Sequence, residues 1–372
     1  MRTLGIEEEL LVVDAETGQP RSVAARVLDR AEELAATVES SDGPGGTVGG
    51  ELQRQQVETD TSPHTSLADL EEDLRRWRDV AIKAARPEGT SILAVGTSPV
   101  AVTPQIVPDS RYAEMHERFG LTAAEQLSCG CHVHVSVDSE DEAIAALNRI
   151  RVWLPTLLAL SANSPFWQGS DTHYASYRSQ VIGRWPISGP PELFDSGAEY
   201  RGWVDELVGC QVLLDAGMVY IDARPSEHYP TLEIRVADVC LDVRDTVLIG
   251  ALARALVDTA VEDWKRGTEP AKVPVTMLRL ATWQAAREGL TGSLLDPVTH
   301  RPRPAYDVLA DLLTHVGPAL RANGDEELVR DRVERLRERG NGAVRQRRVL
   351  EKTGQMVDVI ADLAKVTAGL TD

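Results

Sequence analysis

The first residues of the chain alternate between apolar and polar side chains. In LGIEEELLVVD, leucine, isoleucine and valine recur at alternate positions or in short runs until residues 17–18, a Thr-Gly pair typical of a turn. This pattern predicts a strand followed by a turn. Since alternate residues of a strand point to the same face, Glu7 and Glu9 share one face and Glu8 points to the other.

Further regions are rich in apolar and β-branched residues and predict more strands. They are SILAVGTSP (91–99), CGCHVHVSVD (129–138), MVYIDARPS (218–226) and TLEIRVADV (231–239). Only EHYP separates the last two, which indicates that these strands are neighbours in one sheet.

Apolar residues at helical spacing predict the helices. Ser66 can cap a helix in which Leu67, Leu70 and Leu74 recur at this spacing. The other predicted helical regions are 26–38, 140–163 with a kink or break at Pro155, 243–264, and several helices within 273–365.

Two regions predict loops. One is the Gly-rich stretch 40–50, and the other is 164–194, where proline, glycine, serine and aromatic residues follow no clear period. A loop as long as the second is usually functional or disordered, and its aromatic residues favour an ordered one. The chain shows no repeat and no obvious linker, so the prediction is one α+β domain over residues 1–372.

Composition narrows the class of protein. The 372 residues are 42% hydrophobic and 26% charged, and no apolar run approaches the length needed to cross a bilayer. The N-terminus carries acidic residues where a signal peptide would need an apolar core, and four scattered cysteines are too few for a disulfide framework. These features predict a cytoplasmic protein.

The net charge of -19 limits the partners. It argues against nucleic acid and against an anionic membrane, because both would be repelled. Nucleotides remain compatible, since a local cluster of arginines and divalent cations can hold phosphates inside an acidic protein. The expected partners are small molecules, and a homodimer is left open.

Glu7 and Glu9 form the first candidate cluster. Two carboxylates side by side repel each other, and they stay ionised at low cost only beside a cation or in open water. The acidic triplet alone favours a solvated strand face.

His132 and His134 form the second cluster, on one face of the predicted strand 129–138. This spacing suits a divalent metal, although a buried, hydrogen-bonded histidine pair is a fair alternative. Cys129 and Cys131 face the other way, and we interpret them as small core residues.

Glu233, Arg235 and Ala237 form the third cluster, because alternation puts them on one face of their strand. The pair of charges is either a surface ion pair or a metal ligand beside a phosphate clamp. Glu51 and Glu58 are seven residues apart, which fits two helical turns or an irregular strand, so their geometry stays ambiguous.

Together these residues describe an oxygen-rich site that suits Mg²⁺ or Mn²⁺ better than a structural Zn²⁺. Such ions normally serve phosphates. The chain has no G-x-x-x-x-G-K-[ST] motif and no H-E-x-x-H motif. Two alternatives are a metal-dependent amide hydrolase that uses His132 and His134, and a protein that binds metal or nucleotide without catalysis.

Seven segments in order resemble the carboxylate-amine ligase family, also called glutamate-cysteine ligase type 2, a branch of the glutamine synthetase-like ligases. The segments are GIEEEL, ELQRQQVETDTSP, GTSP, GCHVHVSV, ALSANSPFWQGSDTHYASYR, DARPS and TLEIRVADV, and they run nearly from end to end. The resemblance implies a curved antiparallel β-sheet flanked by helices, a glutamine synthetase-like catalytic fold with its active site on the concave face.

The resemblance also implies roles for individual residues. The implied metal ligands are Glu7, Glu9, Glu51, Glu58, His132 and Glu233. Arg235 matches the arginine that contacts the transferred phosphate, and related ligases often carry another residue at the position of His134, which suits a substrate contact. Arg178 and Arg224 would bind phosphate or a substrate carboxylate, or else form ordinary ion pairs.

The implied chemistry is an ATP-dependent ligation. The γ-phosphate of ATP is transferred to a substrate carboxylate, and an amine attacks the acyl phosphate. Divalent metals would screen the phosphate charge, and Arg235 would stabilise the transferring group. The named substrates of the family are glutamate and cysteine, and the sequence leaves the amine of this protein open.

Overall fold

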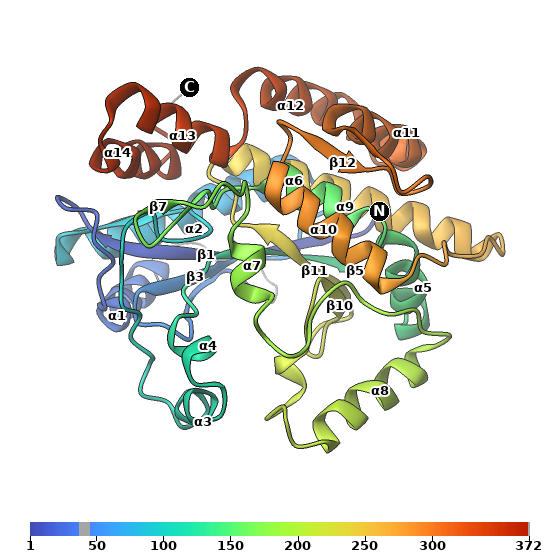
Figure 1. Ribbon diagram of the computed structural model, residues 1–372, viewed down its shortest axis with the longest axis horizontal. Coiled ribbons are helices and arrows are strands. Elements are labelled where there is room, and N and C mark those ends of the chain that lie inside the picture. Colours follow the sequence, from blue (N-terminus) through green and yellow to red (C-terminus); the bar gives the residue numbers. More distant parts are fainter. Residues whose placement is uncertain (37–44, 371–372) are drawn as a thin grey trace.

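The computed structural model describes residues 1–36 and 45–370. One antiparallel sheet dominates them (Figure 1). Its strands are β1 (Leu4–Asp14), β2 (Thr47–Gly50), β3 (Gln56–Asp60), β4 (Thr90–Leu93), β5 (Gly130–Ser136), β10 (Ala223–Pro225) and β11 (Thr231–Asp238). Their order is β10-β11-β5-β1-β3-β2, and β4 also pairs with β1. The first strand of the sequence is therefore central to the sheet.

Three strand pairs are separate from this sheet. They are β6 (Phe166–Trp167) with β7 (Ser170–Asp171), β8 (Ser188–Gly189) with β9 (Tyr220–Ile221), and β12 (Ser293–Leu295) with β13 (Pro302–Pro304). The β8–β9 pair is parallel and ties the loop after residue 164 to the segment that leads into β10.

Most of the helices lie on one side of the sheet, as Figure 1 shows. The helices are α1 (Ala24–Ala35), α2 (Leu67–Ala85), α3 (Ser110–Phe119), α4 (Leu121–Ala124), α5 (Glu140–Ile150), α6 (Leu154–Ser161), α7 (Arg178–Ile182), α8 (Gly197–Gly209), α9 (Val243–Lys265), α10 (Val275–Glu288), α11 (Ala305–Asn323), α12 (Glu326–Arg339), α13 (Gly342–Thr353) and α14 (Met356–Thr367), with 3₁₀ turns η1 (Arg86–Glu88) and η2 (Ala216–Met218). The opposite side carries α3, α4, α7 and α8, and we call the sheet face on that side the open face because it lines a cavity.

The core forms where the apolar faces of the strands meet α2, α5, α6 and α9. Ile6, Val133 and Ile234 lie side by side on three neighbouring strands and are fully buried. Strand alternation then sends the residues on either side of them to the opposite face. The apolar packing of one face thus fixes which polar residues appear on the other.

Glu8 is a charged residue in this core, and it is fully buried. Arg78 of α2 donates two hydrogen bonds of 2.7 Å to its carboxylate, and Thr246 of α9 donates a third. Arg78 also donates to the carbonyl oxygens of Leu241 and Cys240. A fully satisfied ion pair therefore fastens β1 to two helices, and Glu8 takes no part in the open face, as its predicted orientation required.

Several predicted elements differ in their bounds. The predicted helix 140–163 is two helices, α5 and α6, bent by 73° just before Pro155. The predicted strand 218–226 splits into β9 and β10, and the predicted strand 91–99 ends at residue 93. Residues 47–50 of the predicted Gly-rich loop form β2, because they pair with β3. Residues 40–44 of that loop and the end of the predicted helix 26–38 lie outside the described residues.

Within the described part of the chain, no single helix is long and apolar enough to span a membrane. The bent pair α5 and α6 meets the criterion by length and composition when both are taken together. The predicted α+β class, with an antiparallel sheet flanked by helices, is confirmed. The single domain over residues 1–372 stays a prediction.

Removing one partner of the buried Arg78–Glu8 pair should destabilise the fold strongly. We expect Arg78→Ala to lower the free energy of unfolding by about 3–5 kcal/mol, because it leaves a buried carboxylate unpaired. Lys83→Ala is the control on the same helix, since it removes an exposed pair with Asp79 and should cost at most about 0.5 kcal/mol. Denaturant unfolding measures both, and equal losses would contradict this account.

Candidate active site

The open face of the sheet forms the floor of a cavity of about 350 Å³. Side chains from β1, β3, β5 and β11 point into it, and α3, α7 and residues 217–229 supply its walls. The ten site residues predicted from the sequence all line this cavity, namely Glu7, Glu9, Glu51, Glu58, His132, His134, Arg178, Arg224, Glu233 and Arg235. The structure therefore brings together residues that are up to 228 positions apart in the chain, counted from Glu7 to Arg235.

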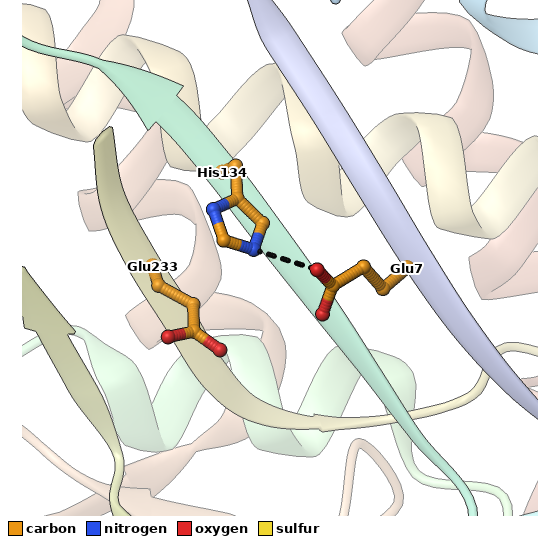
Figure 2. Close-up of side chains that lie close together, drawn as sticks. All are labelled: Glu7, His134 and Glu233. Carbon is orange, nitrogen blue, oxygen red and sulfur yellow. Dashed lines mark ion pairs between the residues drawn. The ribbon is translucent and has the colours of Figure 1, made fainter. Parts of the chain in front are cut away.

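Glu7 occupies the centre of the floor, between the two histidines of β5. Its Oε2 lies 3.0 Å from Nδ1 of His132, and its Oε1 lies 3.2 Å from Nε2 of His134. Figure 2 shows Glu7 and His134 facing each other from neighbouring strands, with Glu233 beside them on β11. Nδ1 of His134 lies 2.8 Å from the hydroxyl of Thr231, which orients the ring.

Glu233 is held by two arginines. Arg224 of β10 donates from Nε to Oε2 of Glu233 at 2.9 Å, and Arg235 pairs with Oε1. Glu233 is buried, and its Oε1 lies 3.8 Å from Nδ1 of His132. The two cations fix the carboxylate beside both histidines.

A β-bulge in β11 sets the position of Arg235. The register shifts between Ile234 and Ala237, so two residues of β11 lie opposite His132 of β5. On the other side of β11 the regular pairing with β10 continues, and the backbone N–H of Arg235 donates to the carbonyl of Asp222. The prediction that Ala237 shares the face of Arg235 is wrong, because after the bulge Ala237 pairs with a core-facing residue of β5 and is buried in the core.

Glu51 and Glu58 belong to a β-hairpin, which resolves their ambiguous spacing. Glu58 lies in β3 and pairs with Glu9 of β1, while Glu51 directly follows β2 at the start of the connection to β3. Oε2 of Glu9 accepts a hydrogen bond from the N–H of Gly130, and Oε2 of Glu51 accepts one from the N–H of Leu52. The hairpin therefore adds two carboxylates to the site edge beside β1.

The electrostatics divide these carboxylates into two groups. Burial alone would raise the pKa of Glu7, but hydrogen bonds from both histidines outweigh it and hold that pKa well below its usual range. Burial would likewise raise the pKa of Glu233, yet Arg235 and Arg224 lower it to about 2. These two carboxylates already have positive partners.

In the part of the chain that the structure describes, Glu51 and Glu58 form no ion pair, although the charge of Arg235 opposes the rise in the pKa of Glu51. Burial, followed by the charge of Glu9, raises the pKa of Glu51 to about 7. Burial, followed by the charges of Glu51, Glu7 and Glu9, raises the pKa of Glu58 well above its usual range. This corner of the cavity gathers more negative charge than the protein's own cations balance.

The carboxylates and histidines form three overlapping triads whose ligand atoms lie within 4.8 Å of one another. The triads are Glu7–His134–Glu233, Glu7–Glu58–His132 and Glu9–Glu51–Glu58. The oxygen-rich donor set and the unbalanced charge both suit hard divalent cations such as Mg²⁺ or Mn²⁺. His134 belongs to one of these triads and His132 to another. The family resemblance, in contrast, implied a metal ligand only for His132 and a substrate contact for His134.

Arg178 begins α7 and reaches into the cavity, where it is 5% exposed. Asp171, from the same aromatic-rich loop, instead pairs with Arg347 and does not line the cavity. Cys129 and Cys131 are both buried, and each belongs to one of the hydrophobic clusters, as predicted for small core residues.

Some wall residues escaped the sequence analysis. Arg111 and Tyr112 reach the cavity from α3, and Tyr220 reaches it from β9. Arg111 makes a two-point ion pair with Asp215, so segments about one hundred residues apart meet above the floor. Asp109 is a typical helix-capping residue, and its side chain caps α3, so the sequence could have predicted this helix. A helix cap does not indicate that the helix lines a cavity.

Comparisons with known proteins agree with this architecture. The family model of glutamate-cysteine ligase family 2 matches residues 3–364. A Streptomyces avermitilis protein named putative glutamate–cysteine ligase 2-1 is 50% identical over 369 residues, covering 99% of this chain and 100% of its own. A Streptomyces coelicolor relative of the same kind is 49% identical over 367 residues, covering 99% of each chain.

Solved structures share the fold at low sequence identity. Glutamate–cysteine ligase from Francisella tularensis, determined in complex with AMP, has a TM-score of 0.69 and 13% identity, covering 99% of this chain and 88% of its own. A bifunctional glutathione synthetase from Pasteurella multocida has a TM-score of 0.67 and 16% identity, covering 99% and 52%. The predicted ligase-type fold is confirmed, and the chain belongs to glutamate-cysteine ligase family 2.

Proposed function

We propose that this cavity joins the carboxylate of glutamate, or of a similar amino acid, to an amine such as cysteine, with ATP as the phosphate donor. The reaction class follows from the family: the protein is an ATP-dependent carboxylate–amine ligase. The observation that carries the proposal is the joint presence of six carboxylates, three histidines and four arginines in one cavity. Triphosphate and substrate carboxylate need this combination of metal ligands and cations.

The metal ligands we propose are Glu7, Glu9, Glu51, Glu58, His132 and Glu233. Their support is the set of triads with ligand atoms within 4.8 Å and the excess negative charge around Glu51 and Glu58. Bound Mg²⁺ or Mn²⁺ would screen the phosphate oxygens and so let a substrate carboxylate approach them. The histidine at position 134 either contacts the substrate or completes the triad with Glu7 and Glu233.

Arg235 is the residue we propose for stabilising the transferring phosphate. It is half-buried, it lines the cavity, and its pairing with Glu233 uses only one arm of a guanidinium that carries five donors. Its charge beside the forming acyl phosphate would offset the charge that develops during transfer. Arg224, anchored on Glu233 and on the carbonyls of Ala216 and Val219, holds that carboxylate in place and presents its remaining donors to phosphate or substrate.

We further propose that the protein acts in the cytoplasm as a single domain, with small molecules as its partners and neither nucleic acid nor membrane. A metal-dependent hydrolase is not favoured, because the cavity holds more carboxylates and arginines than one activated water needs.

Turnover should require ATP, a divalent cation, an amino acid and an amine together. We expect ADP release only in the complete mixture, with one amide product formed for each ADP, as read by coupled ADP assay and by product mass over a panel of amino acid and amine pairs. Product formation that needs Zn²⁺ and ignores ATP would instead establish the hydrolase.

Arg235→Lys should lower kcat by about 100-fold, because lysine cannot reproduce the fixed fork of donors at the transferring phosphate. Arg266→Lys is the control, since Arg266 is exposed and lies outside the cavity. Steady-state kinetics with saturating ATP measure both. A similar kcat for the Arg235 variant and the control would show that Arg235 does not act in the chemical step.

Glu51 supplies a test of the metal site through pH. Its pKa is raised to about 7 in the folded protein without a cation, so its contribution to stability is complete below its ordinary value of 4.5 and is lost as pH rises through 7. In EDTA, Tm should therefore fall between about pH 5 and pH 8, and Glu51→Gln should flatten this decline.

Saturating Mg²⁺ should remove most of the decline in the wild type, because the cation balances the ionised carboxylates. Thermal unfolding at several pH values measures it, with Mg²⁺ added to Glu51→Gln as the comparison. Identical pH profiles for the wild type with and without Mg²⁺ would contradict a cation site at Glu51.

A further inference from the structure

Arg178 differs from the other arginines of the cavity. The other three each pair with a carboxylate, and they are Arg111, Arg224 and Arg235. Within residues 1–36 and 45–370, the guanidinium of Arg178 has no ion-pair partner within 4.0 Å, and its buried Nε has no hydrogen-bond partner. The charge of Arg178 acts to lower the pKa values of Asp222 and Asp238, but neither carboxylate forms an ion pair with it. Burying an unpaired cation is costly, so this guanidinium is well suited to bind an anion from outside the chain.

The guanidinium of Arg178 lies directly against Gly130 of β5, and we call this glycine its seat. A Cβ at position 130 would lie 2.1 Å from Nη2, 2.7 Å from Cζ and 3.0 Å from Nε of Arg178. The backbone of Gly130 has no positive φ, so its conformation does not demand glycine. The requirement comes from the arginine, which lies against β5 only because this position has no side chain.

A buried network holds Arg178 above this seat. The backbone N–H of Arg178 donates to Oγ of Ser164, and that hydroxyl donates to Oδ2 of Asp238. The hydroxyl of Ser176 donates to Oδ1 of the same aspartate. Asp238 in turn pairs with Gly130 across β11 and β5. The aromatic-rich loop and the glycine seat are thus fastened to one point of the sheet.

The surroundings of Arg178 suit a single carboxylate better than a triphosphate. Gln126, Ser128, Trp185 and Tyr220 contact one another in the lining of the same cavity, and they are uncharged side chains with polar ends. Gly130 precedes His132 by two residues on the same strand, a rise of about 7 Å. An amino acid with two carboxylates can span this distance, with one carboxylate near the proposed metal ligands and the other at Arg178.

We propose that Arg178, seated on Gly130, binds the carboxylate next to the amino group of a dicarboxylic amino acid substrate. The planar guanidinium would form two parallel hydrogen bonds with that carboxylate, and the other carboxylate would be left for phosphorylation. Arg178 is then a specificity-determining residue and Gly130 a positioning residue. The inference rests on the proposed ligase function and adds the orientation of its amino acid substrate.

The test compares glutamate with 4-aminobutyrate, which keeps the distal carboxylate and lacks the one next to the amino group. We expect Arg178→Gln to lower kcat/KM for glutamate by about 100-fold, mostly through KM. The same variant should change kcat/KM for 4-aminobutyrate and KM for ATP by less than about threefold. Arg184→Gln, which removes a half-exposed cation outside the cavity, should change none of these values.

Equal losses with both substrates would overturn the proposal, because the arginine would then serve something other than the missing carboxylate. A large rise in KM for ATP would overturn it too, in favour of a phosphate contact.

Gly130→Ala tests the seat. It should reproduce the loss seen with Arg178→Gln for glutamate, while adding less than about threefold in an Arg178→Ala background, because the clash partner is then absent. Gly202→Ala is the matched control, since a Cβ at position 202 would contact nothing within 4 Å. Full additivity of the Gly130 and Arg178 changes would overturn the positioning role.

A binding measurement separates this inference from the proposed function. Glutamate should raise Tm of the wild type and not of Arg178→Gln, whether or not turnover occurs. A wild type that binds glutamate but forms no product with ATP would refute the ligase function and support the carboxylate site. Equal Tm shifts in both proteins, or none in the wild type, would refute the carboxylate site.

Discussion

The main constraint on this structure is that five carboxylates, those of Glu7, Glu9, Glu51, Glu58 and Glu233, lie close together along one face of the sheet despite their mutual repulsion. Glu7 and Glu233 are balanced by histidines and arginines, which keep both pKa values low. Glu51 and Glu58 are half-buried, neither forms an ion pair within residues 1–36 and 45–370, and their pKa values rise. We propose that cations from solution complete this face. The proposed metal-dependent phosphate chemistry follows from that imbalance.

The rest of the fold keeps this face in place. Apolar packing against α9 and its neighbours fixes the register of β1, β5 and β11, and a one-residue slip would send every site side chain to the wrong face. The buried pair of Arg78 and Glu8 fastens β1 to the helices at the point where the strand also presents Glu7 and Glu9 to the cavity. Stability on one face and chemistry on the other therefore come from adjacent residues of the same strand.

Strand alternation predicted the floor of the site from sequence, because period two is a local property of the backbone. It placed Glu7 with Glu9, and His132 with His134, correctly. It failed at Ala237, since a bulge is invisible in the pattern of residue types. Strand alternation also could not predict the walls of the cavity. Arg111 and Asp215 come from distant segments of the chain, and the residue pattern of neither segment indicates that they form an ion pair. Glu51 and Glu58 entered the predicted site only through the family resemblance, because a hairpin and a helix explain their spacing equally well.

We propose that divalent cations complete the carboxylate face and hold the nucleotide there. A crystal structure with Mn²⁺ and a non-hydrolysable ATP analogue tests this most directly, because anomalous scattering locates manganese independently of the refined model. The account predicts manganese peaks at about 2.0–2.3 Å from oxygens of Glu7, Glu58 and their neighbours, each bridging to phosphate oxygens. Manganese or nucleotide bound elsewhere, with these carboxylates contacting only water, would contradict it.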